Sequence, residues 1–205
     1  MLCGLAFVYT VYVNTQQRIF QAAKRLYGRD GLEGLSIRNV AKDVGVTPMA
    51  IYRHYADKDA LIDTLTADAL DVWAARVAAI HAHAPMEWLE ALTRAFLDFA
   101  LEEPRNYEAA FVLPARHARR FPDDFVAGQS PVFNMAFERI ARAKAEGLIG
   151  EASPAEIGIT FWALGQGLVS LYHANRFTDE NEFRAVYAAA MRRCLESFLK
   201  PEAKS

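Results

Sequence analysis

Apolar residues recur at spacings of three and four along most of the chain, which is the spacing of a helix with one buried face. The last predicted helix, from about Asp179, has the clearest pattern, formed by Phe183, Val186, Tyr187, Ala190, Met191, Cys194, Leu195 and Phe198. After residue 14 the sequence has no convincing hairpin, no strand–helix–strand alternation and no internal repeat. The chain is therefore predicted to have an all-α fold.

The charge of the chain is unevenly distributed. The 205 residues are 53% hydrophobic, enough for a buried core, and the formal net charge of −2 does not by itself predict binding to nucleic acid. Residues 15–60, however, hold eight Lys/Arg against five Asp/Glu, a balance of +3, whereas residues 61–205 hold fifteen against twenty, a balance of −5. The basic part of the chain is thus the N-terminal part.

Potential metal ligands do not occur at metal-binding spacings. Cys3 and Cys194 are far apart, and His81 and His83 are two residues apart, which places them on different sides of a helix. We therefore expect no disulfide framework, no metal, no cofactor, and a reducing cytoplasm as the compartment.

The opening run MLCGLAFVYTVYVN is apolar but too short to span a bilayer, and it lacks the charged start and cleavage site of a signal peptide. We do not interpret it as a targeting segment, and no membrane partner is expected. A mis-assigned start codon is one hypothesis for its origin.

Four helix starts and ends stand close together before residue 60. Ser36 can cap a helix that ends at Gly45, and Thr47 followed by Pro48 is a strong start signal for a short helix. Asp57 then opens a long helix. Two short helices can meet across a tight turn when a small residue lies at their crossing, a glycine lies in the turn and an aliphatic residue follows in the second helix. Here these residues are Ala41, Gly45 and Ile51. The pattern predicts a helix-turn-helix.

The segment RIFQAAKRLYGRDGLEGLSIRNVAKDVGVTPMAIYRHYADKDALIDTL resembles the tetracycline-repressor (TetR) family of bacterial transcription regulators, and its GVTPMAIYRHYADKDAL portion is highly specific to that family. The resemblance implies a three-helix DNA-binding domain, placed at residues 15–60, followed by a larger helical domain at 61–205 that binds a small molecule and dimerises. Residues 161–177, FWALGQGLVSLYHANRF, are similar to a C-terminal helix of one branch with a WHG-like domain. Gln166 stands where that branch usually has histidine.

The helix-turn-helix assigns roles to its exposed residues. Residues 47–52 should enter the major groove, where base edges are distinguishable. At its leading end Pro48, Met49 and Ala50 can touch thymine methyl groups, and Arg38 is the best candidate for guanine O6 and N7. Hydrogen bonds to phosphate are expected from Ser36, Thr47, Tyr52, His54 and Lys58; the family resemblance assigns Tyr52, His54 and Lys58 similarly.

Two neighbouring residues have competing interpretations. Tyr55 is expected to pack between the DNA-binding domain and the fourth helix rather than to touch DNA. For Arg53, a DNA contact and a solvated side chain are equally favoured.

The second domain is rich in aromatic residues, which suggests a pocket for a hydrophobic or aromatic effector. The candidate ligand-binding residues are Trp73, Phe96, Phe99, Phe111, Phe133, Phe137, Trp162, Gln166 and His173, with Trp88 and Tyr107 as further aromatic candidates. For each residue alone, a place in the core is the commoner explanation. The basic run ARHARR at residues 115–120 could bind a ligand carboxylate, but a solvated surface is favoured.

Dimerisation is predicted through two helices, at residues 154–175 and 179–198. The first is apolar around most of its circumference, and Gly158 and Gly165 allow another helix to approach closely. A twofold axis would then place two recognition helices on successive major-groove turns of an inverted repeat.

These patterns predict a homodimeric regulator of transcription that is released from its operator DNA by a small-molecule effector. The family resemblance favours a repressor over an activator. One alternative is an architectural protein that binds DNA without sequence preference; another is an enzyme with a vestigial helix-turn-helix. The sequence contains no recognisable catalytic constellation, so we expect no enzyme.

Overall fold

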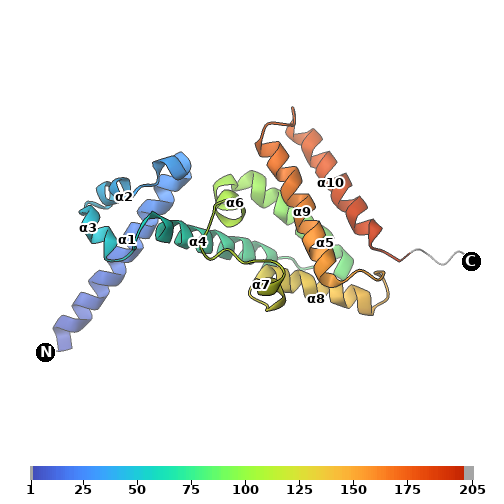
Figure 1. Ribbon diagram of the computed structural model, residues 1–205, viewed down its shortest axis with the longest axis horizontal. Coiled ribbons are helices and arrows are strands. Elements are labelled where there is room, and N and C mark those ends of the chain that lie inside the picture. Colours follow the sequence, from blue (N-terminus) through green and yellow to red (C-terminus); the bar gives the residue numbers. More distant parts are fainter. Residues whose placement is uncertain (1, 201–205) are drawn as a thin grey trace, which may run out of the picture. The chain divides into compact units, whose positions relative to one another are not determined.

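The computed structural model describes residues 2–200, with side chains from residue 15. The helices of this range are α1 (Leu2–Gly34), α2 (Ile37–Val44), α3 (Pro48–Tyr52), α4 (Lys58–Ala78), α5 (Pro85–Glu102), α6 (Pro104–Phe111), α7 (Asp123–Val126), α8 (Pro131–Ala145), α9 (Pro154–His173) and α10 (Glu180–Ser197) (Figure 1). Its β-type pairing is limited to one isolated antiparallel bridge between Ile149 and Leu199. The predicted all-α fold is confirmed.

The chain forms two compact units. Unit 1 contains the residues up to Val72 together with Pro104–Ala118, and unit 2 contains Trp73–Glu103 together with the residues from Arg119 onward. These units do not coincide with the two domains predicted at residues 15–60 and 61–205. The domain boundary after residue 60 concerns function and stays a prediction. The reason is that α6 returns to pack on α1 and so belongs to unit 1.

The core of unit 1 is formed by the apolar faces of α1 to α4. Its buried members are Ile19, Ala22, Ala23, Leu26, Tyr27, Leu35, Val40, Ala41, Val44, Ile51, Tyr55, Leu61, Ile62, Leu65, Ala69 and, from α6, Ala109. The residues of α1 in this set follow the predicted three-and-four spacing. Helix α1 runs from Leu2 to Gly34, and its backbone is non-helical at Gly31, with φ 66° and ψ −155°.

Four helices begin at capping residues, and two of these, Ser36 and Thr47, were predicted as helix starts. Ser36, Thr47, Ser153 and Asp179 each accept a hydrogen bond from a backbone N–H in the first turn of the following helix. Ser153 forms a complete capping box, because Glu156 also accepts from its backbone N–H at 2.7 Å. These starts depend on contacts within four residues, and this explains why they could be predicted locally.

Unit 2 packs α5, α8, α9 and α10 against one another. A side-chain Cβ at Gly158 would lie 3.0 Å from the Phe133 ring, and one at Gly165 would lie 3.2 Å from the Tyr187 hydroxyl. Both glycines therefore permit close approach to α9, as predicted for this helix. The neighbours that approach are α8 and α10 of the same chain.

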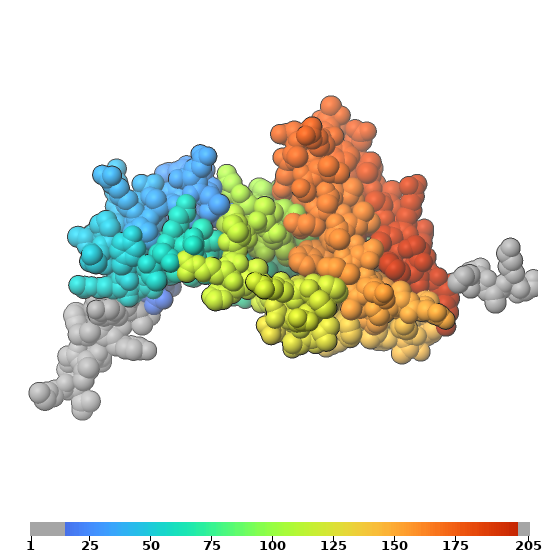
Figure 2. All heavy atoms as spheres, viewed as in Figure 1, coloured from blue at the N-terminus to red at the C-terminus, as the bar shows by residue number. Residues whose placement is uncertain are grey.

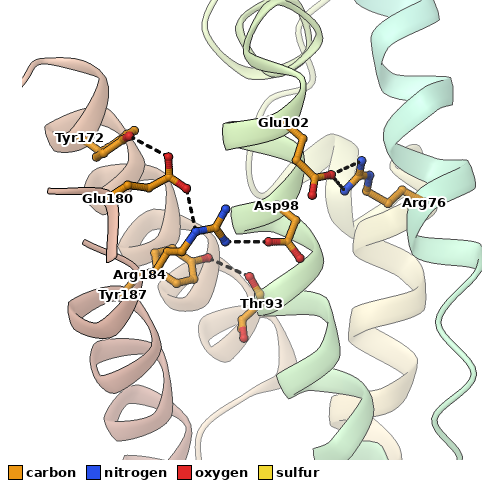
Figure 3. Close-up of polar contacts among 8 residues, drawn as sticks. All are labelled: Arg76, Thr93, Asp98, Glu102, Tyr172, Glu180, Arg184 and Tyr187. Carbon is orange, nitrogen blue, oxygen red and sulfur yellow. Dashed lines mark hydrogen bonds and ion pairs between the residues drawn. The ribbon is translucent and has the colours of Figure 1, made fainter. Parts of the chain in front are cut away.

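Polar contacts tie α10 to α5 (Figure 3). Arg184 lies between two carboxylates, 3.0 Å from Asp98 on α5 and 2.9 Å from Glu180 on its own helix. Hydrogen bonds to Glu180 and Asp98 raise the pKa of the Arg184 guanidinium. Tyr187 donates to the Thr93 carbonyl at 3.2 Å. These contacts orient α10, and with it the outward face of the helix pair α9 and α10.

The segment between α5 and α8 could not be divided reliably from its sequence, which contains three prolines. The structure divides it into α6 and the one-turn helix α7. Phe125 of α7 is buried, with its ring 4.9 Å from that of Phe133 on α8 and 5.7 Å from that of Trp162 on α9. This packing explains the position of a helix with too few residues for a periodic signal.

Candidate nucleic-acid interface

The turn between α2 and α3 has the geometry that its sequence requires. Gly45 has a left-handed backbone, with φ 77°, which an L side chain rarely adopts. The N–H groups of Gly45 and Val46 both donate to the Ala41 carbonyl at 3.0 Å, which terminates α2. Beyond the turn, Ile51 is 0% exposed. Ala41, Gly45 and Ile51 therefore occupy the crossing, turn and anchor positions predicted for a helix-turn-helix.

Helix α3 presents its leading end to solvent. Thr47 Oγ1 accepts from the Ala50 N–H at 3.3 Å, so the hydroxyl hydrogen of Thr47 remains able to donate to another group. Pro48 and Tyr52 are exposed, and Met49 is 68% exposed. Since α3 buries only Ile51, its other side chains are accessible to a partner.

Helix α2 contributes its first turn to the same unit. Ser36 Oγ accepts from the Asn39 N–H at 3.1 Å, and its hydroxyl hydrogen likewise remains available. Arg38 is exposed and takes part in none of the ion pairs found between residues 15 and 200. A guanidinium without an internal partner can form the two parallel hydrogen bonds that guanine offers.

The residues that lead into α4 are less exposed. His54 and Lys58 are half-buried, and Lys58 Nζ donates to the Leu32 carbonyl at 3.0 Å. This bond fixes the ammonium group and leaves two of its N–H groups for a phosphate. Asp57 caps α4 by accepting from the Ala60 N–H at 2.9 Å, as its position predicted.

Tyr55 belongs to the core rather than to the exposed surface. It is buried among the residues of unit 1, in agreement with the favoured interpretation, and burial raises the pKa of its hydroxyl. Arg53 is exposed, which is compatible with either of its two interpretations.

Only some of the basic side chains in residues 15–60 are neutralised by ion pairs within the chain. Lys24, Arg25 and Arg29 pair with Asp68, Asp43 and Asp30, each at 2.6 Å. Arg18 donates to the Val44 carbonyl at 2.9 Å and keeps its charge unneutralised. The exposed basic residues of this segment without an ion pair in the described range are Arg18, Arg38, Lys42 and Arg53. Arg38 and Lys42 lie on α2 and Arg53 directly follows α3, so three of these four unpaired charges lie on the helix-turn-helix.

Arg116 joins the segment after α6 to the start of α4. Its Nη2 lies 2.6 Å from Asp57 Oδ1 and 2.9 Å from Asp59 Oδ2, and its backbone N–H donates to Asp63 Oδ1 at 3.1 Å. The hydrogen bond from Arg116 lowers the pKa of Asp57. Because Asp57 and Asp59 flank Lys58, Arg116 neutralises two carboxylates beside a predicted phosphate contact.

Sequence reasoning missed this role of Arg116. It had offered two interpretations for the ARHARR run, a ligand carboxylate site and a solvated surface, whereas Arg116 binds carboxylates of its own unit. No local signal connects residues so far apart in sequence, and only the packing of α6 on α1 brings them together.

Two family profiles match the chain. Residues 19–65, which include the helix-turn-helix, match the profile described as bacterial regulatory proteins of the tetR family. Residues 89–195 match a tetracyclin repressor-like C-terminal domain. The chain belongs to the TetR family of transcriptional regulators. It is accordingly a DNA-binding regulator with a helix-turn-helix.

Individual relatives of this TetR-family regulator agree with the assignment. The transcriptional repressor DrrR1 of Streptomyces coeruleorubidus is 39% identical over 51 residues, which are 25% of this chain and 19% of that protein. The chain spans between about a fifth and a third of the length of the curated relatives it matches. Their similarity therefore concerns only a part of each protein.

Solved structures share the fold over nearly the whole chain. A Rhodococcus sp. RHA1 protein of unknown function has a TM-score of 0.71 at 23% identity, covering 91% of this chain and 96% of its own. RolR, whose structure is in complex with the ligand resorcinol, has a TM-score of 0.65 at 13% identity, covering 93% of this chain and 90% of its own. At these identities the likeness establishes the fold of the TetR-family regulator.

Replacing Arg116 by glutamine is expected to weaken DNA binding by about threefold for each bound DNA-binding domain. This loss is comparable to the contribution of one phosphate contact. The two carboxylates beside Lys58 would then repel the phosphate backbone, so the loss should diminish as salt screens the charges. Fluorescence anisotropy with labelled operator at several salt concentrations measures it. The unfolding midpoint should change little, because exposed ion pairs contribute little to stability.

Arg119→Gln is the matched control, since it removes the same charge from an exposed residue of the same basic run. An equal loss of affinity in both variants would show that only net charge matters and would contradict the role assigned to Arg116.

The predicted ligand-binding residues fall into several groups. Trp73 packs on Phe96 and Phe99, with ring centroids 5.6 and 5.4 Å apart. Phe133 and Trp162 both contact Phe125, as described above. This places most of the candidates in unit 2, in two aromatic clusters.

Four candidates are not members of these ring clusters, and one of them is Gln166, on α9. Phe111 lies on α6 in unit 1, where its ring is 5.6 Å from that of Tyr107, so the structure does not bring it together with the other candidates. Phe137 on α8 and His173 at the end of α9 are exposed. For Phe111 the physical reason is that Ala109, two residues earlier, packs into the core of unit 1.

Membrane spans and metal clusters are both absent from the part of the chain that the structure describes. Within these residues, no helix is both long enough and apolar enough to cross a bilayer. The same residues contain no group of three or more His, Cys, Asp or Glu side chains arranged to hold a metal ion.

Proposed function

We propose that this TetR-family regulator is a homodimeric repressor that binds an inverted-repeat operator and is released by a small hydrophobic or aromatic effector. The observation that carries the proposal is the accessibility of Arg38 and Met49 on the two helices of the motif, Arg38 without an ion pair in the described range. A charged side chain with no internal partner is available to read a base edge.

The proposed half-site follows from the chemistry of these residues. Arg38 would donate to guanine O6 and N7, and Pro48, Met49 and Ala50 would contact thymine methyl groups, because none of the three side chains can hydrogen-bond a base. Contacts to phosphate would come from Ser36, Thr47, Tyr52, His54 and Lys58. The operator half-site is thus expected to contain a guanine near one or more thymines.

Selection of bound duplexes from a random DNA library at near-physiological salt tests this proposal, with Arg38→Ala in parallel. We expect one inverted repeat for the wild type, and relaxed preference at a single base pair per half-site in the variant, with a discrimination loss of about 1–3 kcal/mol. Recovery of no motif, with an affinity that depends only on salt, would overturn sequence-specific binding and support the architectural alternative.

The proposed dimer forms through α9 and α10, which lie side by side on the surface of unit 2, orange and red in Figure 2. Leu171 on α9 and Val186 on α10 are large apolar side chains exposed in the single chain. Burying such side chains against a second copy removes apolar surface from water. A twofold axis through this face would generate the inverted repeat.

The proposed effector binds among the aromatic side chains of unit 2. Two aromatic clusters, around Trp73 and around Phe125, supply the apolar lining that small-molecule sites have. The resorcinol complex of RolR, which has the same fold, supports an aromatic effector. The name of the repressor DrrR1 supports repression as the sign of control.

Release would follow from a difference in affinity between two states of the dimer. An effector that prefers the state with misplaced recognition helices shifts the population toward it, by no more than its preference. No catalytic step is required, and we propose that the chain has no enzymatic activity.

A further inference from the structure

Gln166 on α9 has a buried polar atom without a protein partner. Its Oε1 is inaccessible to solvent and accepts no hydrogen bond. A buried acceptor left unsatisfied is costly, and in native proteins such groups are few and usually have an explanation such as a bound molecule. A donor from outside the chain, either a bound molecule or an ordered water, would satisfy this acceptor.

The neighbourhood of Gln166 on α9 is aromatic. Trp162 stands one helical turn before it, and residues four apart lie next to each other on a helix face. The Trp162 ring is 5.7 Å from that of Phe125, which in turn is 4.9 Å from that of Phe133. A donor that reaches Gln166 from this side would lie beside aromatic rings, which favour contact with another ring.

The other flank of α9 faces α10. Tyr172 stacks on Phe183, with ring centroids 4.4 Å apart, and Gly165 lies against Tyr187. Tyr172 and Gly165 share one flank of α9, and Gln166 lies about a quarter-turn around the helix from Gly165, as 3.6 residues per turn requires. Gln166 is thus not on the line of residues that contacts α10.

The charge of the surroundings limits what can bind. The residues that are buried as a whole in the described range are all hydrophobic. A charged group placed among the aromatic rings beside Gln166 would lose its hydration, at a large cost in free energy unless an opposite charge compensates it. A neutral donor would lose little and would satisfy the acceptor.

We propose that Gln166 is the polar anchor of a subsite for an uncharged aromatic molecule with an O–H or N–H donor, for which a simple phenol is the smallest probe. The donor hydrogen-bonds to Gln166 Oε1, and the ring packs beside Trp162. The inference rests on the proposed function, in which unit 2 binds the effector, and it adds the chemical class of that effector.

Ligand-observed NMR titration of the full chain tests the proposal with phenol, anisole, toluene and benzoate. Phenol should bind about tenfold more tightly than anisole and toluene, which have the same ring but no O–H or N–H group to donate. This ratio corresponds to one net hydrogen bond. Benzoate should bind more weakly than any of the three. A wild type that binds phenol and anisole equally would overturn the proposal, because the acceptor would then be satisfied by water.

Gln166→Met removes the acceptor at similar side-chain volume. The variant should lose the tenfold preference for phenol and keep its affinity for toluene. Gln129→Met, at an exposed glutamine of the same unit, is the matched control and should bind all four compounds as the wild type does. A phenol preference that survives in Gln166→Met would overturn the proposal.

Operator release is measured separately by adding phenol to the protein–DNA complex. Release that depends on Gln166 supports both the subsite and the proposed function. Binding of phenol through Gln166 without any effect on DNA would contradict the effector role alone and leave the subsite in place. The two failures are therefore distinguishable.

Discussion

Replacing Ile51 by alanine is expected to destabilise the DNA-binding unit by about 2–5 kcal/mol. Ile51 is 0% exposed and is the one buried residue of α3, so its truncation leaves a cavity where α3 meets the core. Loss of this anchor should also abolish specific operator binding, because α3 would no longer be held in one orientation. Urea denaturation followed by circular dichroism measures the first effect, and anisotropy with labelled operator measures the second.

Met49→Ala is the control for this experiment, since Met49 lies on the same helix and is 68% exposed. It should leave the free energy of unfolding nearly unchanged and weaken operator binding only through the lost contact with DNA. If Ile51→Ala were as stable as Met49→Ala, the assignment of Ile51 as the anchor of α3 would be wrong.

Replacing Val186 by aspartate is expected to convert the protein to monomers and to lower operator affinity on the order of 100-fold, because two linked DNA-binding domains gain affinity from being joined. Val186 is 41% exposed in the single chain, and the proposed interface would bury it. An unpaired carboxylate in such an interface is strongly unfavourable. Sedimentation equilibrium and operator titration measure the two effects.

Val126→Asp provides the same chemical change elsewhere in unit 2. Val126 is on α7 and is 71% exposed, outside the proposed interface. This variant should remain dimeric and bind operator as the wild type does. A dimer that persists in Val186→Asp would rule out the α9–α10 face as the interface.

Most of the fold was predictable because the relevant interactions are local. The starts of α2, α3, α9 and α10 depend on capping side chains that bind N–H groups two or three residues away. The turn at Gly45 depends on the backbone freedom of one residue. Because features of this kind depend on adjacent residues, the amino-acid sequence alone is enough to recognise the helix-turn-helix.

The candidate sites were predictable to different degrees. The residues predicted to bind DNA all lie in unit 1, because they come from one short segment whose helices are ordered by that turn. The predicted ligand residues are scattered along the chain, and Phe111 turned out to lie in unit 1 rather than with the others. Aromatic composition indicates that apolar surface must be buried, but it does not say against what.

The sequence by itself determined the class of fold, the helix starts, and the motif that identifies a DNA-binding regulator. Only the tertiary structure decided that α6 packs on α1, that Arg116 pairs with Asp57 and Asp59, and that Gln166 has no partner for its buried oxygen. The difference has one physical cause. Helices form from contacts within a turn, whereas the partner of a side chain depends on which distant segments bury their apolar faces together.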